Sequence, residues 1–146
     1  MSELEKTKQW FEQAIPNPTV EQTCIQVGCH YEEVSEMMEA MHDYDCGLLV
    51  EELANDYKRC ELSQAHHITT MGETDRIALL DALADQIVTA TGVAHMFGMD
   101  ILGALAEVNR SNFSKFEDGE PVFNDQGKIT KGKHYSKPNL KPFIGG

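Results

Sequence analysis

Hydrophobic residues recur at helical spacing over the first three-quarters of the chain. They predict a short helix over roughly 2–14, which ends because Pro16-Asn17-Pro18 cannot continue it. A second, longer helix is predicted from Val20 to about His42. Its apolar positions lie three and four residues apart, a spacing that is typical of one buried face. These positions are Val27, Tyr31, Val34, Met38 and Met41.

Three more helices are predicted downstream. The third covers about 44–63, and the fourth begins at Thr70-Met71-Gly72-Glu73, with Thr70 as N-cap and an acid three residues later. The fourth helix runs to about Phe97, where Gly98 closes it, and the fifth covers about 100–116. The sequence therefore predicts an all-α fold, a bundle of about five helices.

The last thirty residues follow a different pattern. Glycine and proline punctuate two short apolar segments, 122–123 and 128–130, which are predicted to pair as a small hairpin around Asn124-Asp125-Gln126-Gly127. Beyond them, Pro138 and Pro142 favour an extended segment. We interpret residues 1–146 as a single domain, in which 117–146 form a tail that packs on the helical body.

Charge is unevenly distributed along the chain. The net charge of the whole chain is -12, and 19 of the 24 acidic residues precede residue 106, whereas 7 of the 12 basic residues follow it. An acidic body repels nucleic-acid phosphates, which argues against a partner of that class. It favours divalent cations, which prefer oxygen ligands, and the mildly basic tail suits a polyphosphate. A solubilising body with a loose tail is the alternative.

The N-terminus, the apolar stretches and the cysteines indicate where in the cell the protein is expected. The N-terminus is polar and acidic, unlike a signal peptide. Carboxylates interrupt the longest apolar stretch, 77–105, so we expect no membrane span and a cytoplasmic location. The four cysteines fit neither a zinc pattern nor a disulfide framework, and we interpret them as small buried hydrophobes. They are Cys24, Cys29, Cys46 and Cys60.

Asp81 and Asp85 are the only formally charged residues between Arg76 and Asp100. Their spacing of four places both carboxylates on one side of the fourth helix. This helix is apolar nearly all round, which is typical of a buried helix, and two buried like charges require compensation. A divalent cation would supply it. The alternative is that the two side chains face a solvent groove or a basic residue of a neighbouring helix.

The second helix carries a matching set of carboxylates. Glu32, Glu36, Glu39 and Asp43 form one stripe, and Glu33 lies between this stripe and the apolar face. Such a stripe alone is typical of a solvated surface, but its like charges repel without a counter-ion. Together the two acidic helices predict a site for magnesium, which binds carboxylates, waters and substrate phosphates.

Four segments in this order resemble one known family. Glu33-Val34-Ser35-Glu36, preceded by Glu32, and Asp81-Ala82-Leu83-Ala84-Asp85 resemble the two acidic motifs of the MazG-like and phosphoribosyl-ATP pyrophosphohydrolase-like superfamily. Val108-Asn109-Arg110-Ser111-Asn112-Phe113-Ser114-Lys115 and Gly127-Lys128-Ile129-Thr130-Lys131-Gly132 are similar to later segments of one branch of it. The chain departs from the family in two respects: Ala82 stands where the second motif commonly has Glu, and more residues than usual separate the acidic motifs.

The resemblance implies an all-α enzyme, dimeric or tetrameric, that cleaves a nucleoside triphosphate to a monophosphate and pyrophosphate. It implies Mg²⁺, or Mn²⁺ in its place, held by Glu33, Glu36, Asp81 and Asp85. Glu32 or Glu36 would act as the catalytic residue that orients or deprotonates the water. A rival second motif, Glu51-Glu52-Leu53-Ala54-Asn55-Asp56, has Asn55 where the pattern requires Asp.

Substrate contacts are expected near the end of the fifth helix and in the tail. The candidates for phosphate binding are Asn109, Asn112, Lys115, Lys128 and Lys131. The alternatives are backbone caps for the asparagines and solvated charges for the lysines. Trp10 and Phe11 suit either stacking on a base or helix-anchoring core contacts.

Two other functions are consistent with parts of the sequence. His42-Asp43 occurs in HD-type metal phosphohydrolases, which also need further His and Asp ligands. Glu39-Ala40-Met41-His42 matches half of a di-iron bundle motif, but the chain lacks a second copy. A non-enzymatic acidic interaction protein would use its carboxylates only for solubility. It predicts no stabilisation by magnesium, whereas the hydrolase does.

Overall fold

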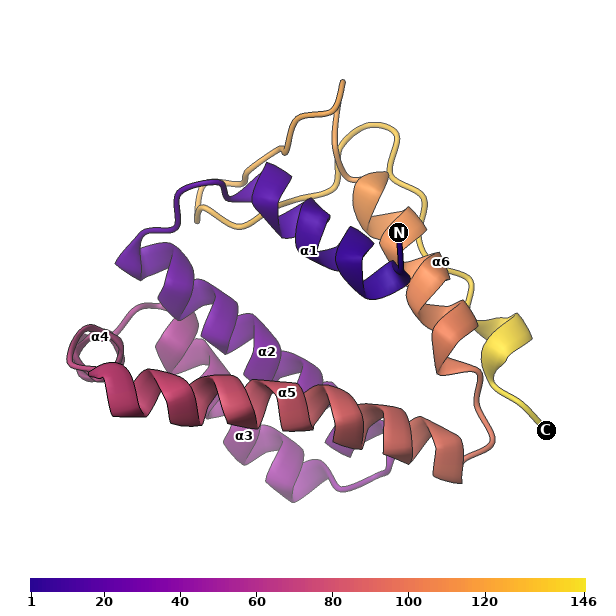
Figure 1. The fold of residues 1–146 in the computed structure, drawn as a ribbon, viewed down its shortest axis with the longest axis horizontal. Helices are drawn as coiled ribbons and strands as arrows, with labels where there is room; N and C mark the ends of the chain where they lie inside the picture. Colours follow the sequence, from indigo (N-terminus) through magenta and orange to yellow (C-terminus); the bar gives the residue numbers. More distant parts are fainter. The chain divides into compact units, whose positions relative to one another are not determined.

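The computed structural model describes all 146 residues as α-helices, one 3-10 helix, turns and extended segments, which confirms the all-α prediction (Figure 1). The chain divides into two compact units, one formed by 17–76 and the other by 1–16 with 77–146. The elements are α1 (Glu3–Ala14), α2 (Val20–Ala40), α3 (Tyr44–Lys58), α4 (Leu62–Thr69), α5 (Glu73–Met96), α6 (Ile101–Phe113) and the 3-10 helix η1 (Lys141–Phe143).

Helices α2 and α3 pack closely through small side chains. A Cβ atom on Gly28 would lie 2.7 Å from the carbonyl oxygen of Ala54, so only glycine permits this approach of the two backbones. Further along the contact, the buried hydroxyl of Ser35 donates a 2.8 Å hydrogen bond to the carbonyl oxygen of Gly47. Tyr31 of α2 stacks on a tyrosine of α3. The small residues therefore set the separation of the pair.

The buried face of α2 is displaced from the predicted one. Its fully buried residues are Cys24, Gly28 and Ser35, whereas the predicted Val27, Val34 and Met38 are only half-buried and Met41 is exposed. Tyr31 is half-buried too, and its ring stacks on Tyr57 of α3. The hydrophobic pattern identified the large residues, but the line of closest contact follows the small ones, because they allow the helices to approach.

The segment between α2 and α5 contains one more helix than predicted. The expected third helix, 44–63, ends at Lys58, and Cys60 takes a left-handed φ of 50° before α4 begins. Thr70 is therefore not the N-cap of the next helix: its hydroxyl donates to the carbonyl oxygen of His66 at the end of α4. The acid that receives the capping hydrogen bond at the start of α5 is Asp75, from the backbone N–H of Gly72.

Helices α1 and α6 meet around an aromatic core in the other unit. Trp10 is buried and stacks on Phe116 at 5.5 Å between ring centroids, while Phe11 meets it edge-on. The indole N–H of Trp10 donates a 2.9 Å hydrogen bond to the carbonyl oxygen of Asn112. Trp10 thus holds α1 against α6, a role in core packing.

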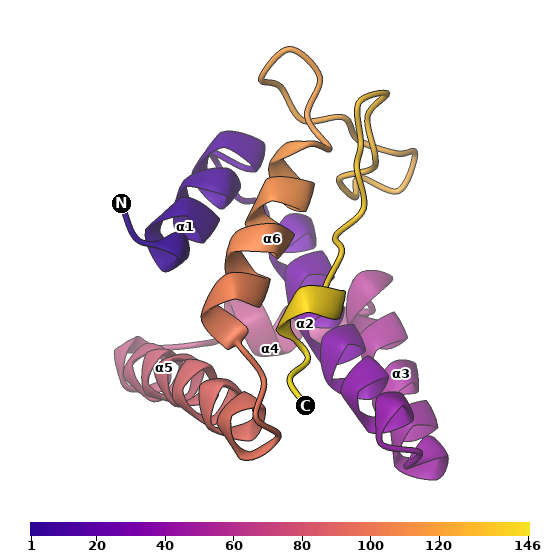
Figure 2. The same cartoon turned by 90° about the vertical axis from the view of Figure 1, so that its right-hand side faces the viewer.

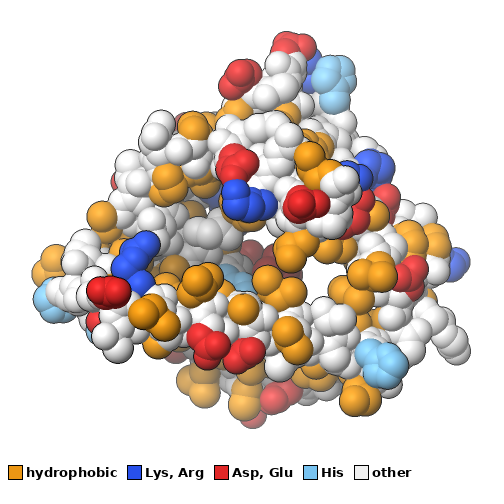
Figure 3. Space-filling view, viewed as in Figure 1, with side chains coloured by type: hydrophobic (Ala, Val, Ile, Leu, Met, Phe, Trp, Pro, Cys, Tyr) orange, Lys and Arg blue, Asp and Glu red, His pale blue; other side chains and the backbone are white.

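Helix α5 is exposed along nearly its whole length in this structure, whereas its apolar pattern predicted a buried helix. Ala94 is its only buried residue, and α5 packs against none of α1, α6 and η1, the other helices of its unit. Hydrophobic side chains line it in Figure 3, with acidic side chains among them. By length and composition alone it is the one helix suited to crossing a membrane. Asp81 and Asp85 lie near its middle, a costly place for carboxylates at bilayer depth.

The C-terminal tail follows α6 in the opposite direction, as both ribbon views show (Figures 1 and 2). The predicted hairpin is present as a single bridge between Phe123 and Ile129. The backbone N–H of Asn124 donates to the carbonyl oxygen of Lys128, and the turn closes at Gly127, whose φ is 76°. Glycine adopts this left-handed conformation without steric cost.

Candidate functional site

The glutamates predicted to bind metal lie on the α2–α3 unit. Glu32 is half-buried and forms an ion pair with Lys58 of α3, whereas Glu33, Glu36 and Glu39 are exposed. A basic residue on the neighbouring helix therefore compensates the charge of Glu32. Glu33 is exposed and forms no ion pair.

Asp81 and Asp85 lie one turn apart on α5, and both are exposed. Neither forms an ion pair, so the alternative in which a basic residue neutralises them finds no support within the chain. They belong to the unit of α1 and α6, whereas the glutamates belong to the other unit. Within each unit, no group of three or more His, Cys, Asp and Glu side chains is placed to hold a metal ion.

The chemistry of these side chains fits a hard cation. All four proposed ligands present carboxylate oxygens, the donors that Mg²⁺ and Mn²⁺ prefer. Glu33 and Asp81 are exposed, and neither has an ion-pair partner that a cation would have to displace. The match to a magnesium site therefore rests on the carboxylate donors alone, because the glutamates and the aspartates belong to separate units.

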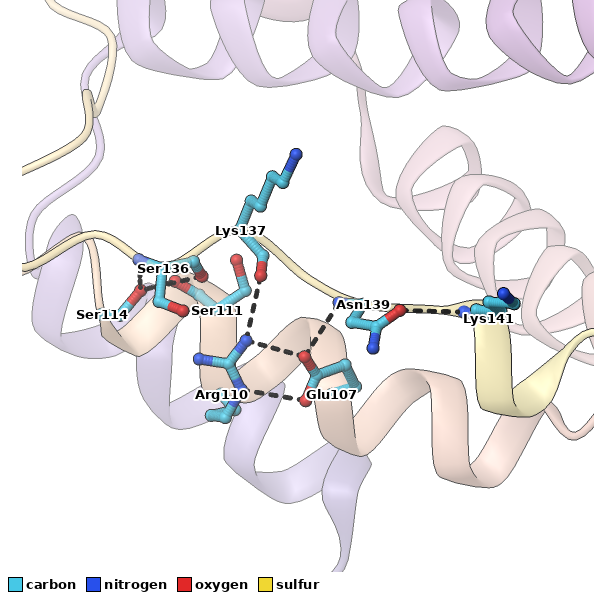
Figure 4. Close-up of polar contacts among 8 residues, drawn as sticks. All are labelled: Glu107, Arg110, Ser111, Ser114, Ser136, Lys137, Asn139 and Lys141. Atoms are coloured by element: carbon cyan, nitrogen blue, oxygen red, sulfur yellow. Dashed lines mark hydrogen bonds and ion pairs between the residues drawn. The ribbon is translucent and has the colours of Figure 1, made fainter.

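The last turns of α6 hold the tail through Glu107 and Arg110, two residues that sequence reasoning missed (Figure 4). Arg110 makes a bidentate ion pair with Glu107 at 2.7 and 2.9 Å, and also donates to the carbonyl oxygen of Lys137. The backbone N–H of Asn139 donates to the same Glu107 carboxylate. Their opposite charges three residues apart were a detectable signal, but such pairs are common on solvated helix faces.

The electrostatics of this pair follow from its hydrogen bonds. The Arg110 guanidinium, together with the N–H of Asn139, lowers the pKa of the Glu107 carboxyl to about 2. The same contact raises the pKa of Arg110. Glu107 is therefore ionised at any pH where the protein would function, and it acts as a fixed anchor for the tail.

Two segments that the sequence singled out meet at the end of α6. Ser114 accepts a 2.9 Å hydrogen bond from the backbone N–H of Ser136. One residue further, the carbonyl oxygen of Lys115 accepts a 2.9 Å hydrogen bond from the N–H of Gly132. The 111–115 segment and the 127–132 segment are thus adjacent in space, although residues 116–126 separate them in the sequence.

The two asparagine candidates have different surroundings. Asn109 is buried, and its side chain bonds to α1: its amide N–H donates to the Glu3 carbonyl and carboxylate, and its oxygen accepts from Thr7. Binding a phosphate would require these bonds to break. Asn112 is half-buried and its side chain forms no hydrogen bond, while its backbone carbonyl accepts from Trp10 and from the N–H of Lys115. Asn112 is therefore the asparagine better placed for a ligand.

The lysines of this region have no carboxylate partners. None of the six after residue 110 forms an ion pair. The ammonium of Lys131 lies over the ring of Tyr135, 4.9 Å from its centroid, while Lys115 is half-buried and Lys128 is exposed. Lys137 extends away from the Glu107–Arg110 pair (Figure 4). These positive charges remain uncompensated within the chain, which favours an anionic ligand.

No family model matches the chain, and neither a curated protein nor a solved structure shows significant similarity to it.

Proposed function

We propose that the protein is a magnesium-dependent nucleoside triphosphate pyrophosphohydrolase, which converts a (d)NTP or a related nucleotide to a monophosphate and pyrophosphate. One observation carries the proposal: the Lys115–Gly132 hydrogen bond brings the two lysine-containing segments together at the end of α6. Lysines without carboxylate partners on two adjacent segments suit a polyphosphate. The exposed carboxylates of α2 and α5 supply the complementary half, a set of magnesium ligands.

In this proposal the carboxylates of α2 and α5 bind the metal and activate the water. Glu33, Glu36, Asp81 and Asp85 hold the metal, which when bound neutralises phosphate charge and lowers the pKa of a bound water. Glu36 or Glu32 orients or deprotonates the attacking water. The ion pair with Lys58 restrains the Glu32 carboxylate.

The tail residues bind the substrate. Lys115, Lys128 and Lys131 contact phosphate oxygens, and the amide of Asn112 donates a further hydrogen bond. Asn109 holds α1 against α6 through its hydrogen bonds to Glu3 and Thr7. It would bind the substrate only after these bonds break. The partners of the protein are then its nucleotide and further copies of itself, as a dimer or tetramer.

The experiment is a product assay on canonical and modified NTPs and dNTPs, with Mg²⁺, Mn²⁺ or EDTA. We expect metal-dependent pyrophosphate release with monophosphate as the second product. Glu36→Gln and Asp85→Asn are expected to lower kcat by about 10²-fold or more. Glu39→Gln is the matched control, because Glu39 is exposed on the same helix but is not a proposed ligand.

Three outcomes would contradict the proposal. Full activity in Glu36→Gln or Asp85→Asn, with the helical circular dichroism unchanged, would remove the ligand assignment. Release of single phosphates would favour an HD-type enzyme. Absence of turnover on every nucleotide, together with no rise in Tm on adding magnesium, would favour the acidic interaction protein.

A further inference from the structure

Cys60 lies in the turn that ends α3 and precedes α4. The N–H of Glu61 donates a 3.2 Å hydrogen bond to the carbonyl oxygen of Asp56. The N–H of Cys60 donates a 2.8 Å hydrogen bond to the carbonyl oxygen of Tyr57. This pair of bonds ends a helix with one left-handed residue, which is usually glycine. Here the left-handed residue is Cys60, with a φ of 50°, and the turn itself gains nothing from its thiol.

The packing of α2 on α3 brings a second thiol to this turn. The two helices are antiparallel, since only residues 41–43 connect them. A Cβ atom on Gly28 would lie 2.9 Å from the backbone nitrogen of Lys58, so the helices touch there. Cys24 lies one turn before Gly28 on the same face of α2, level with the residues that follow Lys58. The thiols of Cys24 and Cys60 accordingly share a hydrogen bond.

The two thiols differ in their access to solvent. Cys24 is fully buried, whereas Cys60 is half-buried at the surface. Burial, together with the hydrogen bond to Cys60, raises the pKa of Cys24 to about 11 and keeps it protonated. Cys60 is therefore the member of the pair that an external reagent can reach.

We propose that Cys24 and Cys60 form a reversible redox site, at which a low-molecular-weight disulfide such as glutathione disulfide converts the two thiols to a covalent bond. The inference concerns only the unit formed by 17–76 and does not depend on the proposed activity. In a reducing compartment such a bond is transient, so it reports an oxidising change rather than permanently linking the helices.

The reaction proceeds through two exchanges. The Cys60 thiolate attacks one sulfur of glutathione disulfide, so that a mixed disulfide forms and one glutathione leaves. The sulfur of Cys24 then attacks the Sγ of Cys60, the bond to the second glutathione breaks, and the proton of Cys24 goes to the departing thiolate. The protein loses two electrons and two protons, and glutathione disulfide gains them as two glutathione molecules.

The new bond would tie the first half of α2 to the end of α3. It closes the chain between residues 24 and 60, which removes conformations from the unfolded state. The oxidised protein is therefore expected to be more stable than the reduced protein.

The first test incubates the folded full chain with glutathione disulfide. Peptide mapping by mass spectrometry is expected to join 24 to 60 with the loss of two hydrogen atoms. Tm should rise by about 5 °C or more, and dithiothreitol should reverse both changes. A bond between another pair of cysteines, or glutathione retained on Cys60, would overturn the redox site. An unchanged Tm would overturn its effect on stability.

The second test uses variants. Cys60→Gly is expected to fold, because glycine suits the left-handed φ, and to show neither the internal bond nor the rise in Tm. Cys24→Ala should stop at the mixed disulfide and retain one glutathione on Cys60. Cys46→Ser is the matched control, since Cys46 is exposed and its thiol bonds to Asp43 instead. Loss of the response in Cys46→Ser, or a full response in Cys60→Gly, would overturn the assignment.

Discussion

The backbone N–H of Gly132 donates a 2.9 Å hydrogen bond to the carbonyl oxygen of Lys115, and this bond fixes the tail at the point where α6 ends. A Cβ atom on residue 132 would lie 2.5 Å from that oxygen and 2.7 Å from the Cγ of Glu117. Because the nearer obstacle is backbone, it cannot rotate away. Glycine at this position is what allows the tail and the helix end to be neighbours.

Gly132→Ala is therefore expected to detach the tail and to lower the free energy of unfolding by about 1–3 kcal/mol. Urea denaturation measures the loss, and limited proteolysis should cleave the tail faster. Gly92→Ala is the control, since a Cβ there meets nothing within 4 Å. Within a helix it should stabilise by about 0.5–1 kcal/mol. Equal stability of Gly132→Ala and the wild type would contradict the close approach.

A second glycine tests the α2–α3 pair. In Gly28→Ala the new methyl group would lie 2.7 Å from the Ala54 oxygen and 2.9 Å from the backbone nitrogen of Lys58. The helices must separate, so we expect a loss of about 1–3 kcal/mol in urea denaturation. Gly47→Ala lies in the same contact, but its nearest neighbour is a flexible glutamate side chain at 3.4 Å. It should be neutral or stabilising, and a larger loss for Gly47→Ala than for Gly28→Ala would refute this packing.

The Glu107–Arg110 pair predicts how stability depends on acid. Arg110 lowers the pKa of Glu107 from its usual 4.5 to about 2 in the folded protein. A lowered folded pKa contributes stability that is fully present above pH 4.5 and is lost as pH falls toward 2. The urea midpoint of Glu107→Gln should therefore change less with pH across this range than the midpoint of the wild type. Glu120→Gln, at an exposed acid without an ion pair, should keep the wild-type profile. Identical profiles for wild type and Glu107→Gln would show that the pair does not anchor the tail.

Sequence patterns predicted the helices wherever termination signals were local. Pro16 and Pro18 ended the first helix, and Gly98, with a φ of 71°, closed the fourth predicted one. The break at 59–61 was missed because Cys60 adopts its left-handed φ without glycine or proline nearby. The hairpin was predicted from Asn124 and Gly127, whose side chain and backbone form the turn themselves.

Periodicity did not predict which partner covers a helix. The apolar character of α5 indicated burial, yet its large side chains are exposed, because hydrophobicity alone does not specify the surface that would cover them. The site shows a similar limit. The order of the tail motifs was readable, but Glu107 and Arg110 hold the tail through backbone groups of Lys137 and Asn139, which leave no trace in residue identity.

The proposed phosphate-binding lysines, Lys115, Lys128 and Lys131, give the prediction closest to function, and this prediction rests on the proposed activity. Lys131→Ala is expected to raise KM for the triphosphate about tenfold, since one charge-assisted hydrogen bond contributes ~1.5 kcal/mol. Lys131→Arg should retain most of the affinity because the charge is kept. Lys141→Ala is the matched control, as Lys141 is an exposed tail lysine without an ion pair on η1, away from the Lys115–Gly132 junction. Steady-state kinetics at two salt concentrations separate the outcomes, because screening weakens a phosphate contact. If Lys131→Ala and Lys141→Ala change KM equally, the cluster acts only through net charge, and the phosphate site must be sought elsewhere in the chain.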